Sequence, residues 1–276
     1  MKLNNRKASI LVISLWILVI LCFCVLGLAH RVSLITKINQ YQIHSLKAYA
    51  LAKAGIKYAI VTVGNDNNNL DYLGEAWNKQ LELSLGEGKF KVSVLDEERK
   101  INLNYANKYL LQVLGFNQNF KDKNKYFFNI LEIKLINNKF LDYDKIKDIV
   151  TVYTSGKINI NTVSSQALEN LIRAILEELE SSGKSISKLE SLSLAKKIVE
   201  ARKKKLFFKD MDDFFSSLDL DAQEKNILNI LINKINFKSN IFYIVSEGQV
   251  NNSKIKKHIE VIFDRVSKKI LYYYEN

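Results

Sequence analysis

A long uncharged apolar run near the start of the chain most constrains its fold. Residues 8–29 read ASILVISLWILVILCFCVLGLA, and no helix breaker separates this run from the helical pattern that follows it. At about 1.5 Å of rise per residue, roughly 20 apolar residues cross the hydrocarbon core of a bilayer as a helix. The sequence therefore predicts a membrane anchor that continues as one long helix to Gly64, where a glycine can cap it.

Positive charges predict the orientation of this anchor. Lys2, Arg6 and Lys7 precede the apolar run, and this bias places the N-terminus in the cytoplasm and the rest of the chain outside it. A cleaved secretory signal peptide is the alternative, but its apolar core spans only about 7–15 residues and ends at a small-residue cleavage site. His30 and Arg31 follow the run here, which favours an anchor that is retained.

Composition limits the chemistry of the exported part. Of the 276 residues, 47% are hydrophobic, which is enough for a packed core besides the anchor. Both cysteines, Cys22 and Cys24, lie in the apolar run, so the exported part can form neither an internal disulfide nor a thiolate metal site. The net charge of +12 indicates either an anionic partner or a lysine-rich genome, and composition alone does not separate the two.

Small side chains recur on one face of the helix after the membrane. Their spacings of 3, 4, 3 and 4 align them along the helix, so that another helix or a sheet can approach closely. We expect this face to be a partner helix interface formed by Ser45, Ala48, Ala52, Gly55 and Ala59.

The remaining patterns predict strands at both ends of the exported part and helices between them. An amphipathic helix is expected over residues 71–85, followed by a β-hairpin made of residues 90–95 and 101–103. Runs rich in β-branched and aromatic residues predict an antiparallel meander at the end of the chain, over residues 241–250, 258–266 and 270–276.

Residues 105–236 are mainly helical in pattern. The helical segments expected there are 105–116, 125–138, 144–153, 165–182, 192–205 and 210–218. The sequence thus predicts an α+β fold in which a long N-terminal helix packs on a small antiparallel sheet, with a large helical domain inserted between strands.

Several segments, in this order, resemble the minor pseudopilin K family, or general secretion pathway protein K, of the bacterial type II secretion system. The matching segments are ASILVISLWILVIL, ALAKAGIKYAI, VSVLDEERKINLN, SGKININTVSSQAL and FYIVSEGQVNNSKIKKHIEVIFDRV. The resemblance covers nearly the full length. It implies a pilin-like subunit without enzymatic activity that caps the tip of the pseudopilus together with minor pseudopilins of the I and J types.

The resemblance also implies a processing site and domain boundaries. A prepilin peptidase would cut between Ala8 and Ser9, and Ile13 stands where most pilin-like proteins, unlike this family, have a glutamate. Ala8 departs from the more usual glycine. The implied parts are a prepilin leader (1–8), a transmembrane half-helix (9–29), a periplasmic half-helix (30–64), a pilin-like domain (65–104 and 237–276) and an inserted helical domain (105–236). The protein would be a single-pass protein of the bacterial inner membrane with its globular part in the periplasm.

A group of oxygen donors gives a candidate metal site. Asp96, Glu97 and Glu98 are followed by Asn102 and Asn104, and calcium takes six to eight oxygen ligands. Some members of the resembled family hold calcium in the globular domain, which makes calcium the candidate cofactor. The alternative is an exposed turn at the tip of a hairpin.

The central region also has features of a second class of protein, so a second function has to be considered. The segment GKININTVSSQALENLI also resembles helix–hairpin–helix DNA-binding proteins, which would make the chain a membrane-anchored extracytoplasmic nucleic-acid receptor. However, it lacks the glycine hairpin with which that motif approaches phosphate. Residues 184–209 hold nine Lys or Arg against two Glu, which suits a solvated helix face, an acidic partner or anionic lipid. We expect no nucleic acid, and no motif of an anchored enzyme is visible.

Overall fold

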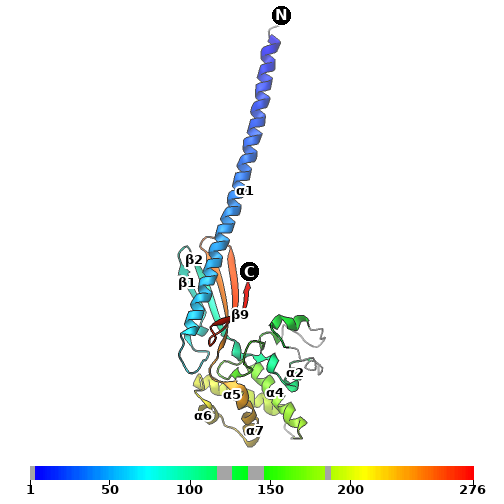
Figure 1. Ribbon diagram of the computed structural model, residues 1–276, viewed down its shortest axis with the longest axis vertical. Coiled ribbons are helices and arrows are strands. Elements are labelled where there is room, and N and C mark those ends of the chain that lie inside the picture. The colour runs from blue at the N-terminus through cyan, green and yellow to red at the C-terminus, as the bar shows by residue number, and fades with distance from the viewer. Residues whose placement is uncertain (1–3, 117–125, 136–145, 184–187) are drawn as a thin grey trace.

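A single helix of 61 residues, α1 (Asn4–Gly64), dominates the fold. The computed structural model describes residues 4–116, 126–135, 146–183 and 188–276. The first half of α1 projects away from the rest of the molecule, and its second half lies along a sheet (Figure 1). The long helix predicted from the apolar run and its extension is confirmed, as is its end at Gly64.

A five-stranded antiparallel sheet packs against the second half of α1. Its strand order is β1-β2-β7-β8-β9, so β1 and β9 are the two edges. The strands are β1 (Leu81–Leu85), β2 (Gly88–Asp96), β7 (Ile241–Val250), β8 (Lys256–Asp264) and β9 (Lys269–Glu275). The last three form the predicted meander, and alternate apolar residues of β7 and β8 face α1 and become buried.

Two predictions near the start of the sheet are wrong. Residues 71–85 do not form a helix: a short 3₁₀ turn, η1 (Ala76–Asn78), leads into β1, and Gly86 at φ +58° closes the turn to β2. Residues 101–103 do not form a hairpin with β2. A second 3₁₀ turn, η2 (Glu97–Arg99), directs the chain out of the sheet, and β3 (Ile101–Asn102) pairs in parallel with β4 (Val150–Thr151). In both places strand pairing overrides the local pattern.

Between β2 and β7 the chain builds a helical lobe at the end of the molecule farthest from the N-terminus (Figure 1). Its α-helices are α2 (Lys108–Val113), α4 (Ser165–Ser181), α5 (Lys188–Lys205), α6 (Met211–Ser216) and α7 (Ala222–Leu231). Its 3₁₀ turns are η3 (Leu103–Tyr105), η5 (Ile130–Leu135) and η6 (Ile232–Lys234), and β5 (Ile158–Asn159) pairs in parallel with β6 (Ile235–Asn236).

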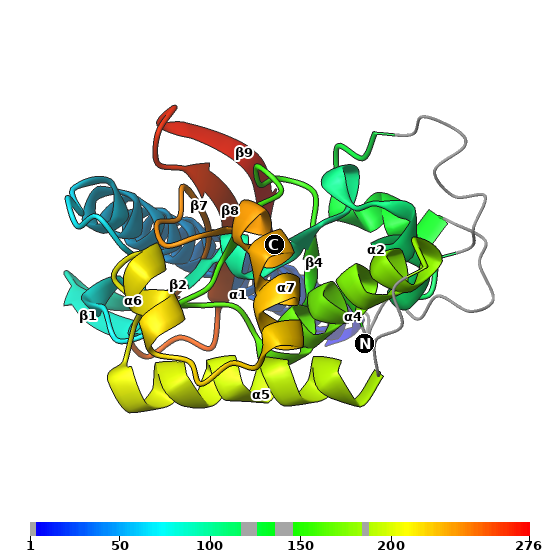
Figure 2. The ribbon, with the colours of Figure 1, turned by 90° about the horizontal axis from the view of Figure 1, so that it is seen from below.

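The helix α4 is the centre of this lobe and packs against α2, α5 and α7 (Figure 2). The Ser164 side chain caps it by accepting a hydrogen bond from the Ala167 N–H. The helix carries an apolar stripe from Leu168 to Leu179, and this stripe is buried. The expected helix over 144–153 is wrong beyond residue 146, because residues 147–149 form a turn and residues 150–151 are strand β4; residues 144–145 lie outside the described residues. The helix α7 was not predicted.

The buried apolar side chains of the described residues form two hydrophobic cores. The first lies between α1 and the sheet and includes Ala52, Phe90 and Phe242. The second fills the helical lobe and includes Ile160 and Phe214. The domain boundaries implied by the resemblance stay a prediction.

Candidate functional site

The first half of α1 is an exposed apolar helix. Side chains such as Leu11, Trp16 and Phe23 are more than three-fifths exposed, although exposure of this kind is unfavourable in water. Among the described residues, one helix is long and apolar enough to cross a membrane, and it is α1. This is compatible with a single-pass anchor. Ala8 and Ser9 lie in the first turns of α1, and cleavage between them stays a prediction.

The small residues of α1 do not face a partner, contrary to the expectation from the sequence. Ala48 and Ala52 are fully buried and Ala59 is 2% exposed, because this face packs against the protein's own sheet. A Cβ on Gly55 would lie 2.2 Å from the Ser246 Oγ atom, so the contact requires glycine at that point. Ser45, at the end of the stripe, is half-buried. The predicted partner helix interface is therefore corrected to an internal helix–sheet contact.

The predicted oxygen cluster is neither an exposed hairpin tip nor one metal site. Asp96, Glu97 and Glu98 are at most 3% exposed, because η2 lies where the sheet meets the helical lobe. Their carboxylates bind different partners instead of converging on a common point. Contrary to the expectation from the sequence, the three residues do not fit a shared calcium shell.

The Asp96 carboxylate joins the two parts of the molecule. Its Oδ2 atom accepts hydrogen bonds from the Ser239 hydroxyl at 2.6 Å, the Thr162 hydroxyl at 2.5 Å and the Asn159 amide at 3.1 Å. Burial raises the pKa of Asp96 to about 6, although the hydrogen bonds oppose this shift.

The Glu98 carboxylate forms a parallel link. It accepts hydrogen bonds from the Asn236 side-chain amide at 2.5 Å and from the Asn240 backbone N–H at 3.1 Å. Burial raises the pKa of Glu98 to about 7, and the Asp96 charge adds to the shift. Asn236 and Asn240 lie before β7, so Glu98 holds the chain where it returns to the sheet.

The other members of the predicted cluster have local structural roles. Glu97 forms an ion pair with Lys100 at 2.9 Å. The Asn102 amide donates to the Thr154 carbonyl, and the Asn104 amide donates to the carbonyls of Phe127 and Val152. These asparagines satisfy backbone carbonyls in irregular segments of the helical lobe.

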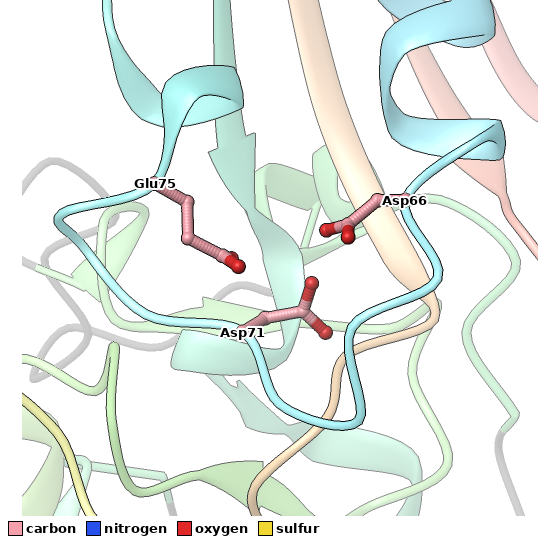
Figure 3. Close-up of side chains that lie close together, drawn as sticks. All are labelled: Asp66, Asp71 and Glu75. Carbon is pink, nitrogen blue, oxygen red and sulfur yellow. The ribbon is translucent and has the colours of Figure 1, made fainter.

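Sequence reasoning missed a second acidic group just after α1. Carboxylate oxygens of Asp66, Asp71 and Glu75 lie within 4.8 Å of one another, and the three side chains point toward a common space (Figure 3). Burial raises the pKa values of Asp71 and Glu75. The residues are spread over a polar loop, and the pattern of that loop carried no metal-binding spacing.

A guanidinium group neutralises part of this acidic charge. Arg265 donates to both carboxylate oxygens of Asp71, at 3.0 and 2.7 Å, and it also contacts the Ser239 carbonyl and Asp66. Arg265 is 6% exposed and Asp71 is fully buried. The arginine thus links the loop after α1 to the segments that precede β7 and follow β8.

The cations at the end of α5 are partly engaged within the lobe. The Arg202 guanidinium donates to the carbonyls of Ile160 and Val163, both at 2.9 Å. Two lysines of the helix form ion pairs, Lys205 with Asp213 and Lys197 with Glu224. Lys203 and Lys204 are exposed. The basic stretch therefore stabilises the lobe in part, and residues 184–187 lie outside the described residues.

Comparison with solved structures identifies the fold. The chain is similar to a chain in the crystal structure of the GspK-GspI-GspJ complex from the enterotoxigenic Escherichia coli type 2 secretion system, with a TM-score of 0.51 and 17% sequence identity. The match covers 89% of this chain and 99% of that chain. No family model and no curated protein matches the sequence. The chain has a pseudopilin-like fold, and the predicted α+β architecture is confirmed.

Proposed function

We propose that this chain is a minor pseudopilin of the K type, a structural subunit that caps the pseudopilus of a type II secretion system. The pseudopilin-like fold supports this function, as does a match over nearly the full length of a chain crystallised in a complex of three such proteins. The subunit would be cut between Ala8 and Ser9, held in the inner membrane by α1, and joined to I-type and J-type pseudopilins.

The position of the helical lobe is the observation that carries the tip role. The lobe is inserted between β2 and β7, and it occupies the end of the molecule opposite the anchor (Figure 1). Subunits anchored by parallel helices stack along those helices, so a lobe at the far end would occupy the space of the next subunit. A terminal subunit meets no such conflict.

A structural role also suits the chemistry of the described residues. The carboxylates with raised pKa values, Asp96 and Glu98, are buried and hydrogen-bonded within the fold rather than set across an open cleft. We therefore propose no enzymatic activity. The nucleic-acid receptor is less well supported, because Arg202 is directed inward to backbone carbonyls rather than outward to phosphate.

The location of the chain in assembled filaments tests the proposal. In cells that overproduce the major pseudopilin, filaments become long enough to label with gold particles against an epitope tag on this chain. We expect label at one end of each filament, whereas a tag on the major subunit should label the whole length. Mass spectrometry of the purified chain should give a mature N-terminus at Ser9. Periodic label along the filament, or failure to join filaments at all, would contradict the tip role.

A further inference from the structure

A cavity of about 220 Å³ lies where the outer face of the sheet meets the helical lobe. Its sheet side comes from β7, β8 and β9, and its lobe side comes from η5 and from residues 147–153. The sheet face concerned is the one opposite α1, because the neighbours of Tyr243 on β7, Phe242 and Ile244, are buried in the core against α1. We call this cavity the tyrosine pocket, and the side chains that define it are Tyr153, Tyr243, Tyr272, Glu97, Glu260 and Lys100.

Three tyrosine rings line the pocket. The strand register brings Tyr243 and Tyr272 to the same level of the sheet, because they lie on either side of Ile262 on β8. Tyr153 approaches from the lobe, and its ring centroid lies 6.2 Å from that of Tyr272 at an interplanar angle of 46°. The face of an aromatic ring carries the negative part of its quadrupole, so a cavity lined by several rings suits a cation.

Two carboxylates of the pocket add negative charge beside the rings. Glu97 is 3% exposed. Glu260 lies on β8, where one of its oxygens accepts the Tyr243 hydroxyl at 2.6 Å and the other lies 2.8 Å from the His258 Nε2 atom. Each carboxylate oxygen has two lone pairs, so Glu260 keeps the capacity to accept a hydrogen bond from a ligand.

The three phenols respond to this negative charge. Burial raises the pKa values of all three, that of Tyr153 to about 12. The charge of Glu97 adds to the pKa shifts of Tyr153 and Tyr243, and the charge of Glu260 adds to those of Tyr243 and Tyr272. Nearby negative charge makes a phenol harder to ionise, and the same charge disfavours an anionic ligand and favours a cationic one.

One cation of the protein already makes the contacts that such a ligand would make. The Lys100 ammonium group pairs with Glu97 at 2.9 Å and lies 5.6 Å from the centroid of the Tyr243 ring. It therefore combines a carboxylate with a ring face, as in aromatic cages that bind cations. Among the Lys, Asp and Glu residues that line the pocket, three are acidic and two are basic. The protein's own lysines thus leave negative charge for a further cation.

We propose that the tyrosine pocket binds a guanidinium or ammonium group that is presented by an arginine or lysine side chain of a partner polypeptide. The cation would contact the rings of Tyr153 and Tyr272 and donate to Glu260, while Leu131 at the rim, which is 43% exposed, gives the rest of the polypeptide an apolar surface. Because the pocket is formed by both the sheet and the lobe, the bound side chain would also link these two parts. The inference goes beyond the pseudopilin function and does not depend on it.

Tyrosine NMR signals of the full chain in detergent test this assignment. The tyrosine rings are labelled with ¹³C, and the protein is titrated with N-acetyl-arginine amide or with N-acetyl-citrulline amide, which has nearly the same shape but no charge. We expect the arginine probe to shift the signals of Tyr153, Tyr243 and Tyr272 with a dissociation constant on the order of 1 mM, as suits the binding of one side chain. The citrulline probe should leave these signals in place.

Substitutions separate the role of the ring from that of the fold. Tyr272→Leu removes a ring and should weaken binding of the arginine probe about fivefold, whereas Tyr272→Phe keeps the ring and should change it less than about twofold. Tyr274→Leu is the matched control, because Tyr274 lies on the same strand, is 45% exposed and does not line the pocket. Glu260→Gln keeps the shape of the side chain but removes its charge, and it should also weaken binding about fivefold. Thermal unfolding of each variant identifies any loss of the fold, and Glu260→Gln then serves as the test if Tyr272→Leu is unstable.

The source of the cation is tested with two further probes of equal charge, a capped Gly-Gly-Arg-Gly-Gly peptide and ethylguanidinium. The peptide should bind at least as tightly, and tighter binding of ethylguanidinium would overturn a polypeptide as the source. Equal shifts with the citrulline and arginine probes, or equal effects of Tyr274→Leu and Tyr272→Leu, would overturn the pocket as a cation site. Neither result bears on the pseudopilin function, which the labelling of filaments tests separately.

Discussion

The sheet makes two contacts of opposite character, one with α1 and one with the helical lobe. The contact with α1 is apolar and very close: a Cβ on Gly248 would lie 2.1 Å from the Ala48 carbonyl oxygen. The contact with the lobe is built from buried polar groups. Asp96 accepts hydrogen bonds from Thr162 and Asn159 of the lobe. The buried Asp71–Arg265 ion pair adjoins this contact through Ser239. The first contact depends on shape and the second on hydrogen bonds and protonation.

This difference gives the two contacts different physical requirements. An apolar helix–sheet contact keeps its strength across pH, so α1 stays attached to the sheet. The charged contact holds the lobe only while each buried group keeps its partner, because an unpartnered buried charge is costly. The two contacts should therefore respond differently to substitution and to pH.

The largest effect is expected from breaking the charged contact at Arg265. Arg265→Met leaves the fully buried Asp71 carboxylate without its counter-charge, and removal of one partner from a buried pair costs about 3–5 kcal/mol. Urea unfolding of the full chain in detergent at neutral pH measures this loss. Arg265→Met combined with Asp71→Asn should recover part of the stability. A loss below about 1 kcal/mol would show that the pair contributes little.

A substitution that weakens the apolar contact should cost less stability, and this cost should not depend on pH. Gly248→Ala places a methyl group against backbone atoms of Ala48 and Ala52, and overpacking of this kind costs about 1–3 kcal/mol. Gly27→Ala is the control, because a Cβ at Gly27 meets nothing within 4 Å. Unfolding at pH 5 and pH 8 should give the same difference for Gly248→Ala. A pH-dependent difference would mean that the two contacts are coupled.

The sequence predicts the apolar contact better than the charged one. The long helix, the strands of the meander and the stripe of α4 follow from hydrophobic patterning. The small residues of α1 indicate a close approach, but the pattern does not say what approaches. Gly248 and Ser246 supply that answer, and they lie on β7, which the chain reaches only after the whole helical lobe. No local pattern specifies a pairing between segments so far apart.

The sequence does not predict the charged contact, for a related reason. Asp96, Glu97 and Glu98 have the composition of an exposed turn, and nothing beside them in the sequence predicts burial. Their partners, which include Asn236 and Ser239, lie in segments brought together only when the chain returns from the helical lobe to the sheet. The acidic group around Asp71 was missed because its partner Arg265 is even more distant along the chain.

The pH dependence of the charged contact follows from two raised pKa values. Burial raises the folded-state pKa of Asp96 from 3.8 to about 6 and that of Glu98 from 4.5 to about 7. The folded protein therefore binds these protons more tightly than the unfolded chain does. The contribution of the two groups to stability is fully present below about pH 4 and is lost as the pH rises through their folded-state pKa values toward 7.

The smallest expected effect comes from Glu98→Gln, which isolates this contribution. The substitution removes the ionisable group but keeps the shape. The oxygen of the new side chain can still accept from the Asn240 N–H, and its amide can donate to the Asn236 Oδ1 atom if the Asn236 side chain flips, which exchanges the bond that Asn236 now donates to Glu98. At pH 8 we expect a gain in stability on the order of 1 kcal/mol, because the variant no longer buries an ionised carboxylate. The variant should also lose less stability than the parent between pH 5 and pH 8, as measured by urea unfolding.

Glu82→Gln is the matched control for the charge change, because Glu82 is an exposed carboxylate paired with Lys89 on the far edge of the sheet. It should leave the dependence of stability on pH unchanged over this range. A Glu98→Gln variant with the same slope as the parent chain would mean that Glu98 does not titrate between pH 5 and pH 8. The charged contact would then be held by hydrogen bonds to a permanently ionised carboxylate, and the contrast between the two contacts would be one of geometry and not of protonation.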